Sequence, residues 1–305
     1  MKKTVLFAAA ALILTACDKN DENTILSSTA AQISATIGGS VTTRARDNAW
    51  SQGDSIGICS IIGGVKQKYV NVAYTTDGGA SAKFSGDTPI YFYNKMALTA
   101  YYPFKGTEGT DPGIINASTD AANQTADKQP KIDFLYAQVD KDKVSNPEIN
   151  FSFAHKMTKL TFIFENGNLS TDVSKITRYE LAGLVLDGKF NTETGECTAD
   201  ETAPRTIVMP VSGVASGQRA SSLILFPQKP GKDTVKLRIH SNEVNDPEAM
   251  QYYNCTLNFD EDELKEGHNY LCTIKVTKTG ISVGQTSITD WQDVVPEKPF
   301  HGSSE

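Results

Sequence analysis

The stretch that decides the fold reads Phe151-Ser152-Phe153-Ala154-His155-Lys156-Met157-Thr158-Lys159-Leu160-Thr161-Phe162-Ile163-Phe164. Apolar side chains recur at every second position, which is typical of a half-buried strand. Up to Met157 these residues have odd numbers, and from Leu160 they have even numbers. A strand packed on one core cannot change face without a bulge or a change of core. We therefore predict a domain junction near Met157, with a strand that runs on into the second domain.

Period-two alternation continues on both sides of this stretch. The expected inward sets are Ile33, Ala35 and Ile37 near the start, then Val235, Leu237 and Ile239, then Tyr253, Cys255, Leu257 and Phe259, and finally Tyr270, Cys272, Ile274 and Val276. Turn signals such as Asp187-Gly188 separate several of the runs, and only residues 260–265 resemble a helical turn. The pattern predicts an all-β protein, most simply two β-sandwiches.

Length and charge narrow the class of protein. The chain has 305 residues, enough for two domains of ordinary size, and a formal net charge of −7. Loss of Lys2 and Lys3 with a leader would lower Lys+Arg from 29 to 27 against 36 acidic residues, a net charge of −9. Phosphate binding needs basic clusters, so this balance excludes nucleic acid as a partner.

The first residues predict secretion. An apolar run of about 12 residues, from Val5 to Ala16, follows Lys2 and Lys3, whereas a membrane-spanning helix needs roughly 20. The run closes with Leu14-Thr15-Ala16-Cys17, which resembles the lipobox of bacterial lipoproteins. The resemblance implies that residues 1–16 are removed and that Cys17 is acylated and anchored in outer-membrane lipid. The alternative is a secretory leader in which the cysteine stands by chance.

Four further cysteines remain, namely Cys59, Cys197, Cys255 and Cys272. In an oxidising compartment they allow three pairings. Cys255 and Cys272 lie on the apolar side of their alternations, which favours buried free thiols.

A search for chemistry finds no catalytic motif. The four histidines have no metal-ligand spacing, and His155 shares the apolar parity of its strand, which favours a hydrogen-bonded core histidine. Nucleophile motifs and phosphate-binding glycine loops are absent from the sequence. We expect no enzyme activity, no cofactor and no metal site.

Six short segments, in this order behind the lipobox, resemble the fimbrillin family, the type V pilins of Bacteroides-like bacteria. They are Trp50-Ser51-Gln52-Gly53-Asp54-Ser55-Ile56-Gly57, Tyr101-Tyr102-Pro103-Phe104, residues 151–160, Leu225-Phe226-Pro227-Gln228, Leu264-Lys265-Glu266-Gly267-His268-Asn269-Tyr270, and Ile288-Thr289-Asp290-Trp291. The resemblance implies two tandem transthyretin-like β-sandwich domains. It divides the chain into a signal peptide (1–16), a lipidated tether with a detachable first strand (17–46), and sandwiches at 47–156 and 157–305.

The resemblance also implies a mode of assembly. A surface lipoprotein completes its first sandwich with its own first strand, an arginine-specific protease removes that strand, and a strand from another pilin subunit fills the groove. The first strand maps to residues 32–38, expected at a sheet edge, with Ile33, Ala35 and Ile37 as its core contacts. The cut maps to Arg44–Ala45, with Arg46 as the second choice.

The donor strand maps to residues 281–295. Ile281 and Val283 offer one set of alternate apolar residues, and Ile288 with Val294 offers a second set of opposite parity. That shift implies a bulge or two separate strands.

Two alternative functions remain. The first is an uncleaved outer-membrane anchor subunit of the same fold. The second is a glycan-binding surface lipoprotein, in which Trp50, Trp291 and Tyr91-Phe92-Tyr93 stack on sugar rings.

Overall fold

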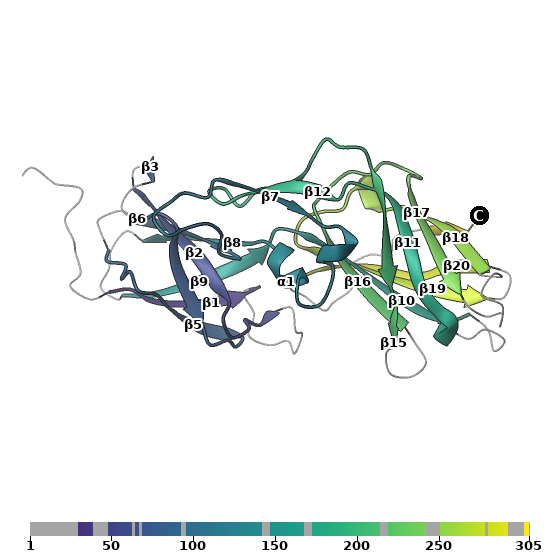
Figure 1. The fold of residues 1–305 in the computed structure, drawn as a ribbon, viewed down its shortest axis with the longest axis horizontal. Coiled ribbons are helices and arrows are strands. Elements are labelled where there is room, and N and C mark those ends of the chain that lie inside the picture. Colours follow the sequence, from purple (N-terminus) through teal and green to yellow (C-terminus); the bar gives the residue numbers. More distant parts are fainter. Residues whose placement is uncertain are drawn as a thin grey trace, which may run out of the picture.

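The structure, a computed structural model, describes residues 30–38, 48–62, 65–66, 69–92, 96–141, 147–167, 173–213, 219–241, 251–277, 280–291 and 302–304. Strands dominate these residues, which confirms the all-β prediction. Two lobes lie end to end along the long axis, the first built mainly from the first half of the chain (Figure 1). Among the described residues, no helix has the length and apolar character needed to span a membrane.

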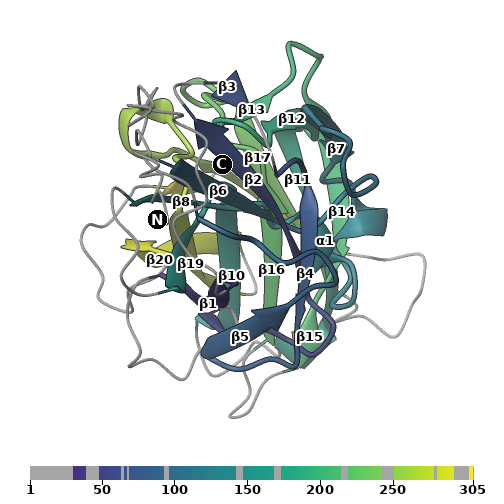
Figure 2. The same ribbon diagram turned by 90° about the vertical axis from the view of Figure 1, so that its left-hand side faces the viewer.

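The N-terminal lobe is a sheet that closes on itself (Figure 2). Its strands are β1 (Gln32–Ile37), β2 (Ser55–Ile62), β3 (Val65–Lys66), β4 (Val72–Thr76), β5 (Ser81–Ser85), β6 (Met96–Tyr102), β8 (Leu135–Lys141) and β9 (Glu148–His155). Their order is β3-β2-β4-β5-β1-β9-β8-β6, and β6 also pairs with β2. The inward side chains of all but the short β3 therefore share one core.

The C-terminal lobe consists of two five-stranded sheets around a second core. One sheet has the order β15-β16-β10-β19-β20, with β10 (Thr158–Asn166), β15 (Ser212–Gly213), β16 (Arg219–Leu225), β19 (His268–Thr277) and β20 (Gly280–Asp290). The other has the order β14-β11-β17-β18-β21, with β11 (Ile176–Leu184), β14 (Arg205–Pro210), β17 (Val235–Ser241), β18 (Gln251–Leu257) and β21 (Gly302–Ser304). The described side chains expected to face inward in β17, β18 and β19 are buried, as predicted.

A small sheet joins the lobes (Figure 1). It contains β7 (Ile114–Ser118), β12 (Asp187–Asn191) and β13 (Cys197–Ala199), so a strand from the first half of the chain pairs with the second half. The short helix α1 (Gln129–Ile132) follows, and three 3-10 turns, η2 (Ala121–Asn123), η3 (Val173–Lys175) and η5 (Asp260–Asp262), complete the helical part of the described residues. The turn expected at residues 260–265 is therefore limited to η5.

Side-chain bonds fasten this crossing segment to the second lobe. The amide nitrogen of Gln124 donates to the carbonyl of Ile224 at 2.7 Å, and that of Gln129 donates to the carbonyl of Ser222 at 2.9 Å. Both carbonyls belong to β16. Hydrogen bonds of buried or partly buried side-chain amides are costly to break, so these two bonds oppose hinge motion between the lobes.

The change of apolar parity near Met157 marks a break between two strands rather than one continuous strand. β9 ends at His155 in the first sheet, and β10 begins at Thr158 in the second. The Lys156 N–H donates to the Phe134 carbonyl and the Met157 carbonyl accepts from Gly267, both at 2.8 Å. Two residues thus move the chain from one core to the other, and the prediction of a continuous strand was wrong on this point.

Candidate functional site

The first strand, β1, is inserted between two other strands. It pairs antiparallel with β5, where Ile33 faces Phe84, and parallel with β9, where Ile37 faces Phe153. The expected edge position is therefore wrong, because alternation tells which side chains face inward and not which strands are neighbours. Loss of β1 would open the closed sheet and expose the edges of both β5 and β9. We call the space between these two strands the β1 slot.

The inward face of β1 is fully packed. Ile33, Ala35 and Ile37 are 3%, 0% and 5% exposed. Burying an isoleucine side chain is worth roughly 1.5–3 kcal/mol, so the two isoleucines together contribute roughly 3–6 kcal/mol before entropy is counted. On the outward face the hydroxyl of Ser34 donates to the carbonyl of Ile149 on β9 at 3.2 Å.

Trp50 lies behind the middle of β1. Its indole Nε1–H donates to the carbonyl of Ala35 at 3.1 Å. The ring makes edge contacts with Phe84, Tyr102 and Phe153 at centroid distances of 5.1, 5.4 and 5.2 Å. The indole therefore joins β1 to both neighbouring strands and to β6.

The residues after Trp50 form the turn that holds it. Gly53 has a φ of +88°, a conformation that favours glycine, and the Asp54 carboxylate accepts from the Ser51 N–H at 2.8 Å. The same carboxylate accepts from the Tyr102 hydroxyl at 2.9 Å. Burial and the nearby Asp54 charge raise the pKa of Tyr102, so this hydroxyl stays protonated as a donor.

A third apolar cluster lies where the lobes meet. We call it the junction cluster, and its buried members are Tyr101, Ile132, Phe134, Met157, Phe190, Cys197, Ile224, Phe226 and Trp291. Phe134 and Phe190 stack at a centroid distance of 4.7 Å. Four of the six segments that carry the fimbrillin resemblance contribute a residue here, namely Tyr101, Met157, Phe226 and Trp291. Sequence reasoning gave no signal that these segments would meet.

His155 and Trp291 stack on each other at this junction, with centroids 4.2 Å apart and planes 3° apart. The His155 Nδ1 lies 3.0 Å from an Asp133 carboxylate oxygen, which confirms a hydrogen-bonded core histidine. The Lys159 ammonium lies over the Trp291 ring at 5.6 Å. Trp50 and Trp291 are only 4% and 7% exposed, so neither ring offers an open face to a sugar.

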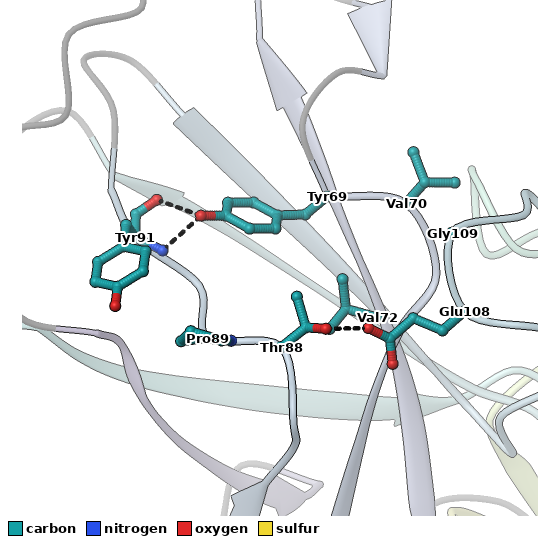
Figure 3. A pocket seen from close by; sticks show the side chains of 8 residues that line it. All are labelled: Tyr69, Val70, Val72, Thr88, Pro89, Tyr91, Glu108 and Gly109. Carbon is teal, nitrogen blue, oxygen red and sulfur yellow. Dashed lines mark hydrogen bonds between the residues drawn. The ribbon is translucent and has the colours of Figure 1, made fainter.

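In the described part of the Tyr91-Phe92-Tyr93 run, Phe92 and the backbone of Tyr91 are tied into the fold. Phe92 is 1% exposed, and the Tyr91 N–H bonds to the Tyr69 hydroxyl at 2.7 Å (Figure 3). A nearby cavity of about 400 Å³ includes the Glu108 carboxylate, which accepts from the Thr88 hydroxyl. The hydroxyls of Tyr69 and Thr88 and the Glu108 carboxylate thus bond within this wall, whereas the Tyr91 ring lines the cavity.

A cavity lies at each end of β1. Ile33 lines a cavity of about 510 Å³ between β4 and β5. Ile37 lines another of about 660 Å³ at the lobe junction, together with Trp50 and Trp291. Among the described residues, the two isoleucines at the ends of β1 therefore each border a cavity.

The expected donor residues belong to the second core in this structure. Ile281 is 4% exposed, and Val283 and Ile288 pack against the same cluster. The pairing of β20 with β19 shifts between Cys272 and Ile274, which places residues of opposite parity on one face. The predicted bulge is confirmed. Cys17, Arg44, Ala45, Arg46 and Val294 lie outside the described residues.

All four cysteines beyond Cys17 are buried and none forms a disulfide with another, as the alternation favoured for Cys255 and Cys272. Burial raises the pKa of Cys197 and Cys272, so these thiols stay protonated and unreactive. Within the described ranges, no three His, Cys, Asp or Glu side chains gather as a metal site would require.

Comparison with known proteins gives the following relatives. A protein of Bacteroides uniformis, described as a proposed fimbrium subunit, Fim1C, is 26% identical over 310 residues, which cover 95% of this chain and 96% of that protein. The crystal structure of a proposed cell adhesion protein from Bacteroides ovatus has 30% identity and a TM-score of 0.73, covering 88% of this chain and 99% of the other. A second such protein, from Bacteroides uniformis, has 22% identity and a TM-score of 0.67 over 86% and 98% of the two chains, and indicates the fold alone.

A family model described as fimbrillin-like matches residues 43–291. This range contains all six segments noted above, and it begins after β1. With a match over most of its length, the chain belongs to the fimbrillin-like family.

Proposed function

We propose that this protein is a structural subunit of a cell-surface fimbrium, of the type V pilus kind, that contributes to adhesion and assembles by strand exchange. The chain is exported as a lipoprotein and held in the outer membrane through Cys17. The observation that carries the proposal is the insertion of β1, a six-residue strand that pairs with a strand on each side. Its covalent connection to the strands it pairs with runs through residues 38–48, so one cut there makes β1 a separate peptide.

The positions of the arginines support processing within that link. The chain has six arginines, and Arg44 and Arg46 lie between β1 and Trp50. The other four each stand in a strand, namely Arg178, Arg205, Arg219 and Arg238. Proteases cut paired strands poorly, because the substrate backbone must be free to enter the active site. An arginine-specific maturation protease therefore cuts at Arg44–Ala45, or after Arg46, in preference to the rest.

The two lobes are further proposed to be the two tandem transthyretin-like domains, with a boundary between residues 156 and 157, and in the first of them the strands form one closed sheet instead of two facing sheets. The separate cores support this division. The crossing segment from β7 to α1 ties the domains together, so a fimbrium subunit of this design behaves as a stiff rod.

Donation of a strand to a neighbouring subunit uses the C-terminal segment. Because Ile281, Val283 and Ile288 pack in the second core, donation requires β20 to leave β19 or a later stretch around Val294 to act instead. A donor supplies both backbone partners and side chains to an empty groove, as in other strand-addition complexes. The names of the relatives, a fimbrium subunit and cell adhesion proteins, agree with this role.

The test uses the full-length lipoprotein, digested under native conditions with an arginine-specific protease. We expect a new N-terminus at Ala45 and multimers on a non-reducing gel, alone or with other pilins. The Arg44→Gln/Arg46→Gln variant is the control and should remain uncut and monomeric. Cleavage near Arg44 that never yields multimers or co-assembly contradicts the subunit role. A native N-terminus that stays at acylated Cys17 supports the uncleaved anchor instead.

A further inference from the structure

The β1 slot has a defined shape along its length. Its two ends hold large side chains, Ile33 against Phe84 and Ile37 against Phe153. Its middle holds Ala35, which is fully buried opposite Ala82 of β5. The order of inward side chains is therefore large, small, large.

Trp50 sets the small middle position. Its Nε1 lies 3.1 Å from the Ala35 carbonyl, so the indole occupies the space behind this residue. Phe84, Tyr102 and Phe153 hold the ring by edge contacts, and Trp50 also lines the cavity at the lobe junction, so the ring can move only by giving up these contacts. Its backbone is also fixed by the reciprocal bonds between Trp50 and Gly79, at 3.0 and 2.9 Å. A larger side chain at the middle position would collide with a rigid wall.

Pairing on both sides adds a second requirement. The Gln32 N–H donates to the Pro147 carbonyl at 2.9 Å, and the Gly38 N–H donates to the Phe153 carbonyl at 2.8 Å. Peptide groups of a strand point alternately to its two sides, so the residues between them bond β9 and β5 in turn. A proline anywhere in the slot would remove one of these bonds, and unlike an edge strand this slot has no solvent side to receive it.

Resting on the proposed function, we infer that the partner which fills the emptied slot is a proline-free strand of a different pilin subunit, with a large apolar, small, large apolar order at alternate inward positions. Residues 280–305 contain no three alternate residues in that order. Ile281 and Val283 are followed by Gln285, and Val294 is followed by Pro296. The bulge in β20 brings Ile288 to the face of Val283, but the extra residue of a bulge disrupts the ladder, and this slot has a ladder on each side. The C-terminal segment of this chain thus suits a slot of another shape, and its neighbours in the fimbrium are other subunits.

The test measures binding of labelled peptides to the full-length protein cut at Arg44. The peptide of residues 30–39 should exchange into the slot, and its Ala35→Leu form should bind about tenfold or more weakly. Thr36→Leu is the control, because it places the same leucine side chain on the outward face of the strand, where it should change binding by no more than about twofold. A Ser34→Pro peptide, and peptides of residues 280–291 and 292–305, should fail to bind.

A second readout follows the slot itself. The chain has two tryptophans, so in a Trp291→Phe background Trp50 alone reports whether β1 is present. Its emission should shift to longer wavelength when the slot empties and return when the 30–39 peptide binds. Equal binding of the wild-type and Ala35→Leu peptides, or binding of residues 280–305, overturns the inference and leaves strand exchange intact. Failure of every peptide, the 30–39 peptide included, overturns strand exchange and the inference together.

Discussion

The first strand of the chain and its last long strand are held in different ways. β1 has six residues and pairs with a strand on each side, whereas β20 has eleven residues and, among the described strands, pairs with β19 alone. β1 completes a closed sheet, and β20 ends an open one. Loss of β1 leaves a slot with two walls and a floor at Trp50, whereas loss of β20 leaves one exposed edge.

This difference assigns the two ends to two tasks. A two-walled slot selects its occupant by the sizes of the inward side chains, and the small space behind Ala35 is its sharpest feature. An edge strand is released by breaking one ladder and is the cheaper segment to donate. In the assembly proposed above, the N-terminal lobe is accordingly the acceptor, and the C-terminal edge is the source of a donor.

The largest expected effect comes from emptying the ends of the slot in the uncut chain. Each Ile→Ala change in a packed core costs about 2–5 kcal/mol, so Ile33→Ala/Ile37→Ala should destabilise the N-terminal lobe by about 4 kcal/mol or more. Ile281→Ala on β20 should cost about 2–3 kcal/mol and act on the other lobe. Urea unfolding with hydrogen exchange resolved by lobe measures both. If Ile281→Ala lowered the free energy of unfolding as much as Ile33→Ala/Ile37→Ala does, the slot and the edge strand would not differ in the way described.

Next in size is overpacking the middle of the slot. Ala35→Leu should destabilise the uncut chain by about 1–3 kcal/mol, because the indole of Trp50 can move aside only by losing its bond to the Ala35 carbonyl and its edge contacts. Thr36→Leu, on the outward face, should change the free energy of unfolding by less than about 0.5 kcal/mol. Thermal melts compare the two variants, and indistinguishable values would mean that the slot has no size filter.

A pH effect of similar scale tests the lobe junction. Burial raises the pKa of Tyr101 to about 12, whereas in the unfolded chain it stays near its ordinary value of 10. The folded state therefore holds the proton more tightly, and its contribution to stability is complete below pH 10 and is lost as the pH rises toward 12. Tyr101→Phe should unfold with a flatter dependence on pH in this window. An unchanged slope in alkaline urea titrations would contradict the burial of this hydroxyl.

The smallest effect separates the two tryptophans. Trp50→Phe removes the bond to the Ala35 carbonyl and should cost about 1 kcal/mol beyond the loss of ring volume. The Trp291 Nε1 is buried and has no hydrogen-bond partner among the residues that the structure describes, so Trp291→Phe removes an unsatisfied donor there and should cost less. Chemical denaturation of the two variants gives the comparison, which the reverse order would contradict.

Alternation along the sequence was enough to predict which side chains of β17, β18 and β19 are buried, and the parity shift within residues 281–294 predicted the bulge in β20. These are local properties, because a strand has a period of two wherever it lies. The insertion of β1 between β5 and β9 depends on which strands become neighbours, and alternation is the same for either arrangement.

The contacts at the lobe junction also could not be predicted from the sequence. The stacking of His155 on Trp291 joins residues far apart in the chain, and the pairing of β7 with β12 crosses the expected domain boundary. Neither has a periodic signature. The six segments that resemble the fimbrillin family include residues of this junction, but the resemblance did not indicate that these segments contact one another.

The central claim is that β1 can be removed from the fold. The mature N-terminus of the protein recovered from surface fimbriae tests this claim most directly. Intact-mass and N-terminal analysis of the assembled subunit should show a chain that begins at Ala45, or just after Arg46, with residues 30–38 absent and a foreign strand paired to β5 and β9. A subunit that is built into the fimbrium and still carries its own residues 30–38 would contradict the account.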